Sequence, residues 1–443
     1  MRMGFVFIKM KIEKLYSLFL QFPKICTDSR KDLKNSIFFC LSGENFNGNQ
    51  FAAQTLEKGA AFVVVDDKNY KLDDARCIFV SDSLATLQQL ASFHRKQFAI
   101  PVVGITGTNG KTTTKELIKA VLSKKYAVVA TKGNFNNHIG VPLTLLQIDK
   151  KTEIAIIEMG ANHPDEIEFL CNLALPNYGI ITNIGKAHLE GFGSLAAIKK
   201  TKLALYLSVI SRKGTLFANF DDFLLKKEAE DTDYISYGQD ADFDIHGTIL
   251  SEFPFLELNW ELKNQENTYK VSSKLFGNYN FPNILAAISV GHYFKISPEI
   301  ISGALEDYHP QNNRSQFIKG KNNELIMDAY NANPESLKVA LANFSKDIHH
   351  SKALILGDMF ELGQIAEQEH QTILESIRTV DFCSVVLVGS LFKQFETKYS
   401  DFHFFNNTNE LIAQINTLNL NQLRILIKGS RGIKLEVLQD YLL

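Results

Sequence analysis

Residues 102–117 have the sequence VVGITGTNGKTTTKEL, which joins an apolar run to a glycine-containing loop and a helix start. The run 102–106 is typical of a buried strand. The apolar positions that follow the loop recur on one helix face: Leu117, Ile118, Val121 and Leu122. Glycines at 107 and 110 let the backbone curl so that its N–H groups point at a phosphate. We therefore predict a phosphate-binding loop between a strand and a helix.

The spacing within this loop assigns roles to two further side chains. Lys111 would reach the β- and γ-phosphates of a nucleotide, and Thr112 would offer its hydroxyl to Mg²⁺. The common pattern G-x-x-x-x-G-K-[ST] requires glycine at position 105, where this chain has Ile105. The loop is therefore a variant of the common type, and the alternative interpretation is a simple glycine turn before a helix.

The chain of 443 residues is too long for one core and predicts about three domains. Short strands at 37–41, 61–65 and 77–80 with a helix at 84–93 indicate a small α/β domain over 1–98. Residues 99–310 alternate strands with helices, as in a mostly parallel sheet, and end in an alternating pattern at 240–275 that predicts an antiparallel edge. A polar stretch at 309–313 suits a linker. The remainder, 311–443, resumes the alternation and predicts a Rossmann-like domain.

Polar residues follow several of these apolar runs directly. Ligands of open α/β sheets bind outside the carboxyl ends of the strands. The runs end at five such points: Glu158, Asn183, Asp328, Asp358 and Lys428. Their distribution over two domains predicts two facing sites with a cleft between them.

Composition excludes several classes of protein. Hydrophobic residues make up 45% and charged residues 22%, which is ordinary for a globular chain. The net charge of −2 argues against a chain-wide basic surface, so we expect no nucleic-acid partner. Five cysteines without a C-x-x-C motif fit a reducing compartment, so we expect a cytoplasmic protein. No apolar run is long enough to cross a membrane, so we expect no membrane insertion. We also expect a monomer. Lysines at 9, 11 and 14 interrupt the apolar start, so we expect no targeting segment.

The loop 103–116 resembles the ATP loop of the Mur ligases, and folylpolyglutamate synthases carry a related one. Five further stretches narrow the resemblance: 133–144, 158–167, 183–194, 328–334 and 428–431. Together with residues 27–44 they resemble the MurF type of Mur ligase over nearly the whole chain. The resemblance implies three domains: 1–98 for the UDP-sugar, 99–310 for ATP and magnesium, and 311–443 for the incoming dipeptide.

The implied activity is an ATP-dependent ligation in peptidoglycan precursor synthesis. ATP would convert the carboxylate of UDP-N-acetylmuramoyl-tripeptide to an acyl phosphate, which the amine of D-alanyl-D-alanine attacks. A MurE-type ligase that adds a single amino acid is the enzymatic alternative, although the Asp-Asn-Pro-Arg motif of that type is absent. A non-catalytic nucleotide-binding relative is the alternative from another class.

The residues themselves make Glu158 a natural Mg²⁺ ligand, because it is a carboxylate at a strand end. Without the resemblance, His188 would be an ordinary loop histidine and Lys202 part of a solvated basic helix start. The resemblance implies that His188 and Lys202 are catalytic residues together with Lys111. It also implies that they bind Mg²⁺, about two ions in all, together with Thr112 and Glu158, and that Lys202 is carbamylated.

Binding roles are implied for the remaining motif residues. The nucleotide would contact Gly107, Thr108, Asn109, Gly110, Lys111, Thr112, Thr113, Asn283 and Arg314. The substrates would contact Ser29, Arg30, Asn136, Asn137, Asp328, Asn331, Asn333, Lys428 and Arg431. Asn283 is alternatively a helix cap. The family's Asp-Gly-His triplet is Asn47-Gly48-Asn49 here, and the glycine before the linker arginine is Asn313.

Overall fold

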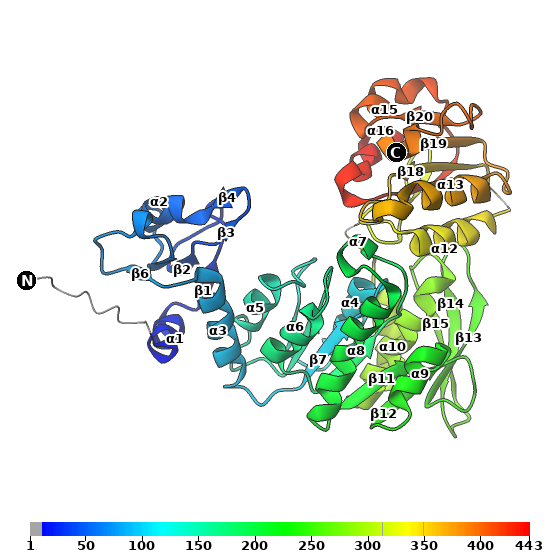
Figure 1. Ribbon diagram of the computed structural model, residues 1–443. Coiled ribbons are helices and arrows are strands. Elements are labelled where there is room, and N and C mark those ends of the chain that lie inside the picture. The colour runs from blue at the N-terminus through cyan, green and yellow to red at the C-terminus, as the bar shows by residue number, and fades with distance from the viewer. Residues whose placement is uncertain (1–10, 312, 349) are drawn as a thin grey trace, which may run out of the picture.

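The computed structural model describes residues 11–311, 313–348 and 350–443. Its three large sheets are arranged in sequence order along the chain (Figure 1). Each sheet lies within one of the ranges predicted for the three domains, and helices pack on the sheet faces. The α/β class with parallel-rich sheets is therefore confirmed. The stretch 1–10, where we expected no targeting segment, lies outside the described residues, as does position 312 of the predicted linker.

The N-terminal sheet has the strand order β1-β2-β5-β6, and all neighbours are parallel. The predicted strands at 37–41, 61–65 and 77–80 and the predicted helix at 84–93 are confirmed to within a few residues, and the domain has five further α-helices and strands that the sequence analysis did not predict. In chain order, the elements of this domain are α1 (Ile12–Gln21), β1 (Lys24–Cys26), β2 (Ser36–Phe39), β3 (Ser42–Gly43), β4 (Phe46–Asn47), α2 (Ala52–Glu57), β5 (Phe62–Val65), β6 (Cys77–Phe79) and α3 (Ser83–Arg95). Helix α3 also packs against α5 and α6 of the next domain. It therefore joins the two domains side by side, as Figure 1 shows.

The central sheet has nine strands in the order β15-β14-β13-β12-β11-β10-β7-β9-β8. Its strands are β7 (Val102–Thr106), β8 (Val128–Ala130), β9 (Ile154–Glu158), β10 (Tyr178–Ile181), β11 (Thr215–Asn219), β12 (Tyr234–Gly238), β13 (Ile245–Ser251), β14 (Glu257–Leu262) and β15 (Thr268–Ser272). Only the β13–β14 and β14–β15 pairs are antiparallel, which confirms the antiparallel edge predicted at 240–275.

Helices cover both faces of the central sheet because its strands are buried on both sides. They are α4 (Lys111–Leu122), α5 (Gly140–Leu145), α6 (Glu166–Ala174), α7 (Leu189–Phe192), α8 (Leu195–Ser211), α9 (Phe223–Ala229), α10 (Phe281–Tyr293) and α11 (Pro298–Asp307). Alternate side chains of β7 enter the two opposite cores: Val103 and Ile105 pack with α4 and α10, whereas Val102 packs on the other side. The strand ends remain free to form a site.

The C-terminal sheet has the order β16-β17-β21-β18-β19-β20, in which only β16 is antiparallel to its neighbour. Its elements are β16 (Gln316–Lys319), β17 (Glu324–Asp328), α12 (Pro334–Ser345), β18 (Lys352–Gly357), α13 (Ala366–Ile377), β19 (Ser384–Val388), α14 (Ser390–Lys393), β20 (His403–Phe405), α15 (Thr408–Gln414), β21 (Arg424–Lys428) and α16 (Gln439–Leu442). The alternation of strands and helices predicted for residues 311–443 is therefore confirmed. In the part of the chain that the structure describes, no helix is both long and apolar enough to span a membrane.

Candidate active site

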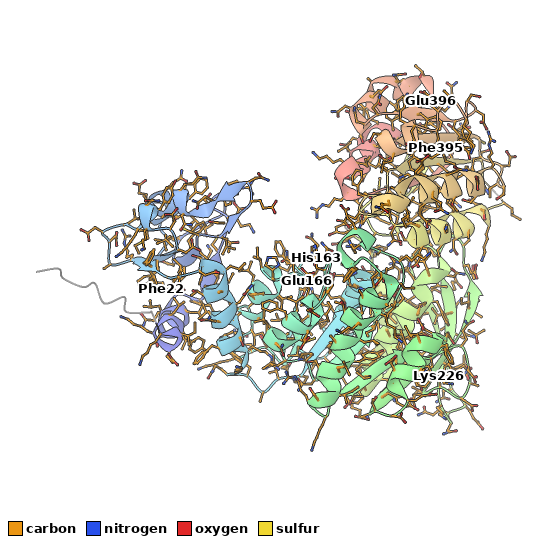
Figure 2. The ribbon with its side chains drawn as sticks, viewed as in Figure 1. Phe22, His163, Glu166, Lys226, Phe395 and Glu396 are labelled. Carbon is orange, nitrogen blue, oxygen red and sulfur yellow. The ribbon has the colours of Figure 1, made fainter. Side chains whose placement is uncertain are left out.

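A cavity of about 730 Å³ lies where strand ends of the central sheet meet the C-terminal domain. Most of the predicted site residues line it: Thr108, Asn109, Gly110, Lys111, Thr112, Thr113, Asn136, Asn137, Glu158, His188, Asn283, Arg314, Asp328, Asn331, Asn333 and Lys428. His163 and Glu166 also line it, and Figure 2 labels both on the upper edge of the central domain. A second cavity of about 630 Å³ adjoins Thr113, and Arg314 borders both.

The phosphate loop has the strand–loop–helix context that its sequence predicts. Gly110 has a φ of +80° at the start of α4, and a Cβ atom there would lie 2.7 Å from Oδ1 of Asn283. Both the backbone angle and the close approach require glycine. Nζ of Lys111 donates to the carbonyl oxygens of Gly107 at 2.8 Å and Thr108 at 3.0 Å. The lysine therefore curls over the loop, where a bound phosphate would replace the carbonyl contacts.

The end of β10 holds this loop in place. Oδ1 of Asn183 accepts a hydrogen bond from the backbone N–H of Asn109 at 2.9 Å. The Thr182 hydroxyl donates to the carbonyl oxygen of the same residue. Thr108 donates its hydroxyl to the Gly185 carbonyl at 3.2 Å and accepts the Gly185 N–H at 2.9 Å. These bonds order the loop before any ligand arrives, which lowers the entropic cost of binding.

Glu158 has the surroundings of a cation ligand. Its side chain is 1% exposed, and Oε1 accepts hydrogen bonds from Thr112 at 3.0 Å and Asn136 at 2.8 Å. Oε2 is buried without a hydrogen-bond partner among the described residues, and Nζ of Lys115 lies 3.7 Å away. A hard cation such as Mg²⁺ would satisfy this oxygen.

The oxygen ligands Glu158 and Thr112 fit magnesium better than a metal ion that takes all of its ligands from protein side chains. Within the described residues, no group of three or more His, Cys, Asp and Glu side chains is arranged to hold a metal ion. Magnesium binds through one or two carboxylates together with waters and substrate phosphates. Glu158 and Thr112 beside a phosphate loop supply that combination.

Lys202 lies in α8 and is buried, so the interpretation of this stretch as a solvated helix start is wrong. Its Nζ donates to the carbonyl oxygen of Gly107 at 3.0 Å. Burial lowers the pKa of Lys202 well below its ordinary value, and the charge of Lys111 lowers it further. Burial also lowers the pKa of Lys111 to about 8, against the raising effect of Glu158. At the base of the phosphate loop, the positive charge of Lys111 therefore disfavours protonation of Lys202.

The C-terminal domain supplies the opposite wall of the cavity. Asp328 and Lys428 form an ion pair at the ends of the neighbouring strands β17 and β21. The side-chain amide of Asn333 caps α12 through the N–H of Ser336, and it also donates to Oδ1 of Asn109 at 2.8 Å. Asn333 therefore links the C-terminal domain directly to the phosphate loop.

Arg314 enters the cavity from the connection between the central and C-terminal domains. Its guanidinium lies 3.5 Å from the ring centroid of Tyr330, and its Nε is buried without a hydrogen-bond partner among the described residues. Arg431 lies on the same ring at 5.4 Å. Stacking fixes the guanidinium while leaving its donors free for an anion.

Asn283 lies inside α10 rather than at its cap. Its Oδ1 accepts from the Thr114 hydroxyl at 3.0 Å, and its Nδ2 donates to Asn280 at 3.0 Å. The helix-cap alternative is therefore wrong, because the capping position belongs to Asn280. The amide holds the glycine loop against α10, and its role toward a nucleotide base stays a prediction.

Five predicted residues do not line the main cavity: Ser29, Arg30, Gly107, Lys202 and Arg431. Arg30 is highly exposed and pairs with Asp28 at 2.8 Å, and this contact lowers the pKa of Asp28 to about 2. In the same domain, Asn49, where the resemblance implies a histidine, donates hydrogen bonds to Ser42, Asn47 and Asp66. Asn49 therefore has a structural role at this position.

The expectation that Asp358 faces a ligand is wrong. This carboxylate is 1% exposed and accepts the backbone N–H groups of Leu391 and Phe392, both at 2.9 Å. It therefore caps α14 inside the C-terminal domain. Burial raises the pKa of Asp358 and lowers that of the neighbouring His370.

Sequence reasoning missed four residues that contribute to the site. Lys115 lies within the motif 103–116 and Tyr330 within the motif 328–334, so membership of these motifs could have indicated both residues. Glu335 accepts the backbone N–H of Lys186 at 2.8 Å across the domain interface. Glu361 pairs with His188 from the other domain. Nothing local in the sequence indicates these last two contacts.

Comparison with protein families agrees with this geometry. The model of the Mur ligase middle domain matches residues 105–291, and that of the Mur ligase glutamate ligase domain matches residues 313–431. A strand-to-helix phosphate loop facing a second α/β domain is thus the site of an ATP-dependent ligase, and the chain belongs to the Mur ligase family.

Within this family the similarity is to the MurF type. The chain is 35% identical to the UDP-N-acetylmuramoyl-tripeptide–D-alanyl-D-alanine ligase of Bacillus subtilis, over 93% of this chain and 91% of that protein. A MurF crystal structure from Acinetobacter baumannii is 30% identical with a TM-score of 0.83, covering 95% of this chain and 93% of the other. MurF from Thermotoga maritima in complex with ADP is 26% identical with a TM-score of 0.81, covering 95% and 97%.

Proposed function

We propose that this chain joins D-alanyl-D-alanine to UDP-N-acetylmuramoyl-tripeptide at the cost of ATP, in the synthesis of peptidoglycan precursors. One observation carries the proposal: the phosphate loop, Glu158 and the strand ends of the C-terminal domain line a single cavity. The relatives with matching names align over nearly the whole chain.

The reaction needs charge neutralisation first and positioning second. A carboxylate is a poor electrophile, so transfer of the γ-phosphoryl group makes an acyl phosphate, from which phosphate leaves after attack by the dipeptide amine. Phosphoryl transfer depends mainly on aligned groups and on cations around the phosphate oxygens. We assign this neutralisation to Lys111 from the loop and Arg314 from the opposite wall.

We assign the magnesium ligands to Thr112, Glu158 and His188, together with Lys202. Bound magnesium would supply further positive charge to the phosphates. Burial lowers the pKa of Lys202 well below its ordinary value and so favours the neutral amine, which is the form that reacts with CO₂ to give a carbamate. Carbamylation, with loss of a proton, would turn this buried amine into an anionic oxygen ligand at the base of the loop.

The three domains divide the substrates between them. We propose that residues 1–98 bind the UDP end through Ser29 and Arg30, and that 99–310 bind ATP, the metal and the sugar–peptide part through Asn136 and Asn137. Residues 311–443 would bind the dipeptide. Its ammonium, amide and carboxylate complement the polar wall formed by Asp328, Asn331, Asn333, Lys428 and Arg431. The enzyme would act as a cytoplasmic monomer.

A phosphate-release assay tests this function against the alternatives. With ATP and Mg²⁺, the full-length protein should release phosphate only when both the UDP-linked tripeptide and D-alanyl-D-alanine are present. Release with a UDP-linked dipeptide and a single amino acid would identify a MurE-type ligase. Absence of release with every acceptor, despite measurable nucleotide binding, would identify a non-catalytic relative.

A further inference from the structure

The C-terminal domain places a carboxylate against His188 of the central domain. Oε2 of Glu361 lies in direct contact with Nδ1 of His188, although the two residues are far apart in sequence. The short 3₁₀ helix η4 (Gly363–Ile365), which directly follows, packs against α7 beside the histidine. Glu361 therefore belongs to an extended contact between the domains.

Neighbours of Glu361 are anchored in the core of their own domain. Asp358 is buried and accepts backbone N–H groups at the start of α14. The side chain of Met359 is fully buried, and its backbone N–H donates to Nε2 of His370 at 3.1 Å. Leu362 is buried on the other side of Glu361. The buried Asp358 and His370 thus fix the loop from which Glu361 projects.

Both residues of this contact have a left-handed backbone conformation. His188 has a φ of +52° and Glu361 a φ of +64°, a region that is uncommon for residues other than glycine and especially for glutamate. Such conformations persist only where the surroundings impose them, and they concentrate at functional sites. The structure therefore holds each side chain in a direction that a relaxed backbone would not choose.

The arrangement leaves one ring nitrogen of His188 available. A neutral imidazole carries a proton on one nitrogen and a lone pair on the other. Nδ1 of His188 faces the Glu361 carboxylate, so a neutral ring that donates from Nδ1 keeps its lone pair on Nε2. Nε2 has no hydrogen bond to any described residue, and the side chain lines the same cavity as Glu158. Histidines that bind metals commonly donate their other N–H to a carboxylate.

We propose that Glu361 is a positioning residue for the divalent cation: it orients His188, so that docking of the C-terminal domain completes the cation site. This inference rests on the metal role proposed above for His188. It predicts that metal affinity depends on a carboxylate outside the domain that binds the nucleotide. If Glu361 instead covered His188 and excluded the metal, its removal would strengthen metal binding.

The test measures metal binding without turnover. Mn²⁺ replaces Mg²⁺ as a paramagnetic probe, and electron paramagnetic resonance follows its binding to the full-length protein with ADP. Glu361→Ala should weaken Mn²⁺ binding about 10-fold or more, in the range typical of carboxylates that orient metal ligands. Glu361→Gln keeps an acceptor and should lose less. Glu367→Ala removes an exposed carboxylate nearby and should change nothing.

Two controls separate this role from misfolding and from the proposed reaction. ADP binding in the presence of EDTA should be equal in all variants, which shows an intact nucleotide loop whether or not the protein ligates D-alanyl-D-alanine. In a His188→Ala background, Glu361→Ala should have no further effect on Mn²⁺ binding. Equal or tighter Mn²⁺ binding by Glu361→Ala, or an equal loss in both backgrounds, would overturn the proposal.

Discussion

Nucleotide binding should lose its pH dependence when Lys111 is replaced. Burial lowers the pKa of this lysine to about 8, with Glu158 opposing the shift and Arg314 adding to it. A polyphosphate beside Nζ stabilises the protonated form. Binding therefore takes up a proton wherever the free lysine is neutral, and affinity must fall as the pH rises above about 8.

The size of the effect follows from the protonated fraction of the free protein. With a pKa of about 8, about three quarters of the molecules carry the charge at about pH 7.5, and about 3% do at about pH 9.5. If only the protonated form binds well, affinity falls about 25-fold over this interval, which is about 2 kcal/mol.

Isothermal titration calorimetry with ADP and EDTA measures this directly, because metal hydrolysis then plays no part. Lys111→Arg keeps its charge throughout and should give a flat profile, and Lys111→Met should bind weakly at every pH. Lys125 is an exposed lysine just beyond the same helix, and Lys125→Arg serves as the control. This variant should show the same dependence of ADP affinity on pH as the unsubstituted protein. A flat profile for the unsubstituted protein, or a slope that survives in Lys111→Arg, would refute the reasoning.

Substitutions at three further positions test other contacts of the site. Asn333→Ala removes a helix cap and should cost about 1 kcal/mol in urea unfolding, whereas Asn333→Asp keeps the cap and loses only the bond to Asn109; equal losses would contradict this. Lys202→Met should slow ligation about 100-fold or more, and removing CO₂ should slow the unsubstituted enzyme but not the variant. Lys115→Met leaves buried Glu158 without its neighbouring cation and should destabilise the fold by about 3 kcal/mol; an unchanged unfolding curve would mean that the pair contributes nothing.

Local patterns predicted most of the fold correctly. The apolar run 102–106 forms β7, and the face of Leu117, Ile118 and Val121 packs α4 on the core. The alternation at 240–275 forms the antiparallel edge strands. These helices and strands depend on hydrogen bonds and side-chain periodicity within a few residues. The local order of apolar and polar residues is therefore enough to predict them.

Burial of individual polar side chains was predicted less well. Lys199, Lys200 and Lys202 look alike in sequence, yet only Lys202 is buried, because that face of α8 turns toward the phosphate loop. Asp358 follows a strand much as Asp328 ends one, but the start of helix α14, where Phe392 lies 34 residues further along the chain, takes its carboxylate as a cap. Desolvation depends on neighbours that are distant along the chain.

The amino-acid sequence by itself determined the α/β class, the position of the phosphate loop and the motifs of a Mur ligase, because each depends on short-range spacing. Only the tertiary structure decided that Asn333 contacts Asn109 and that Glu361 faces His188. Each of these pairs joins two separately folded domains. Their distance is set by how the domains pack, and no local preference of either residue encodes it.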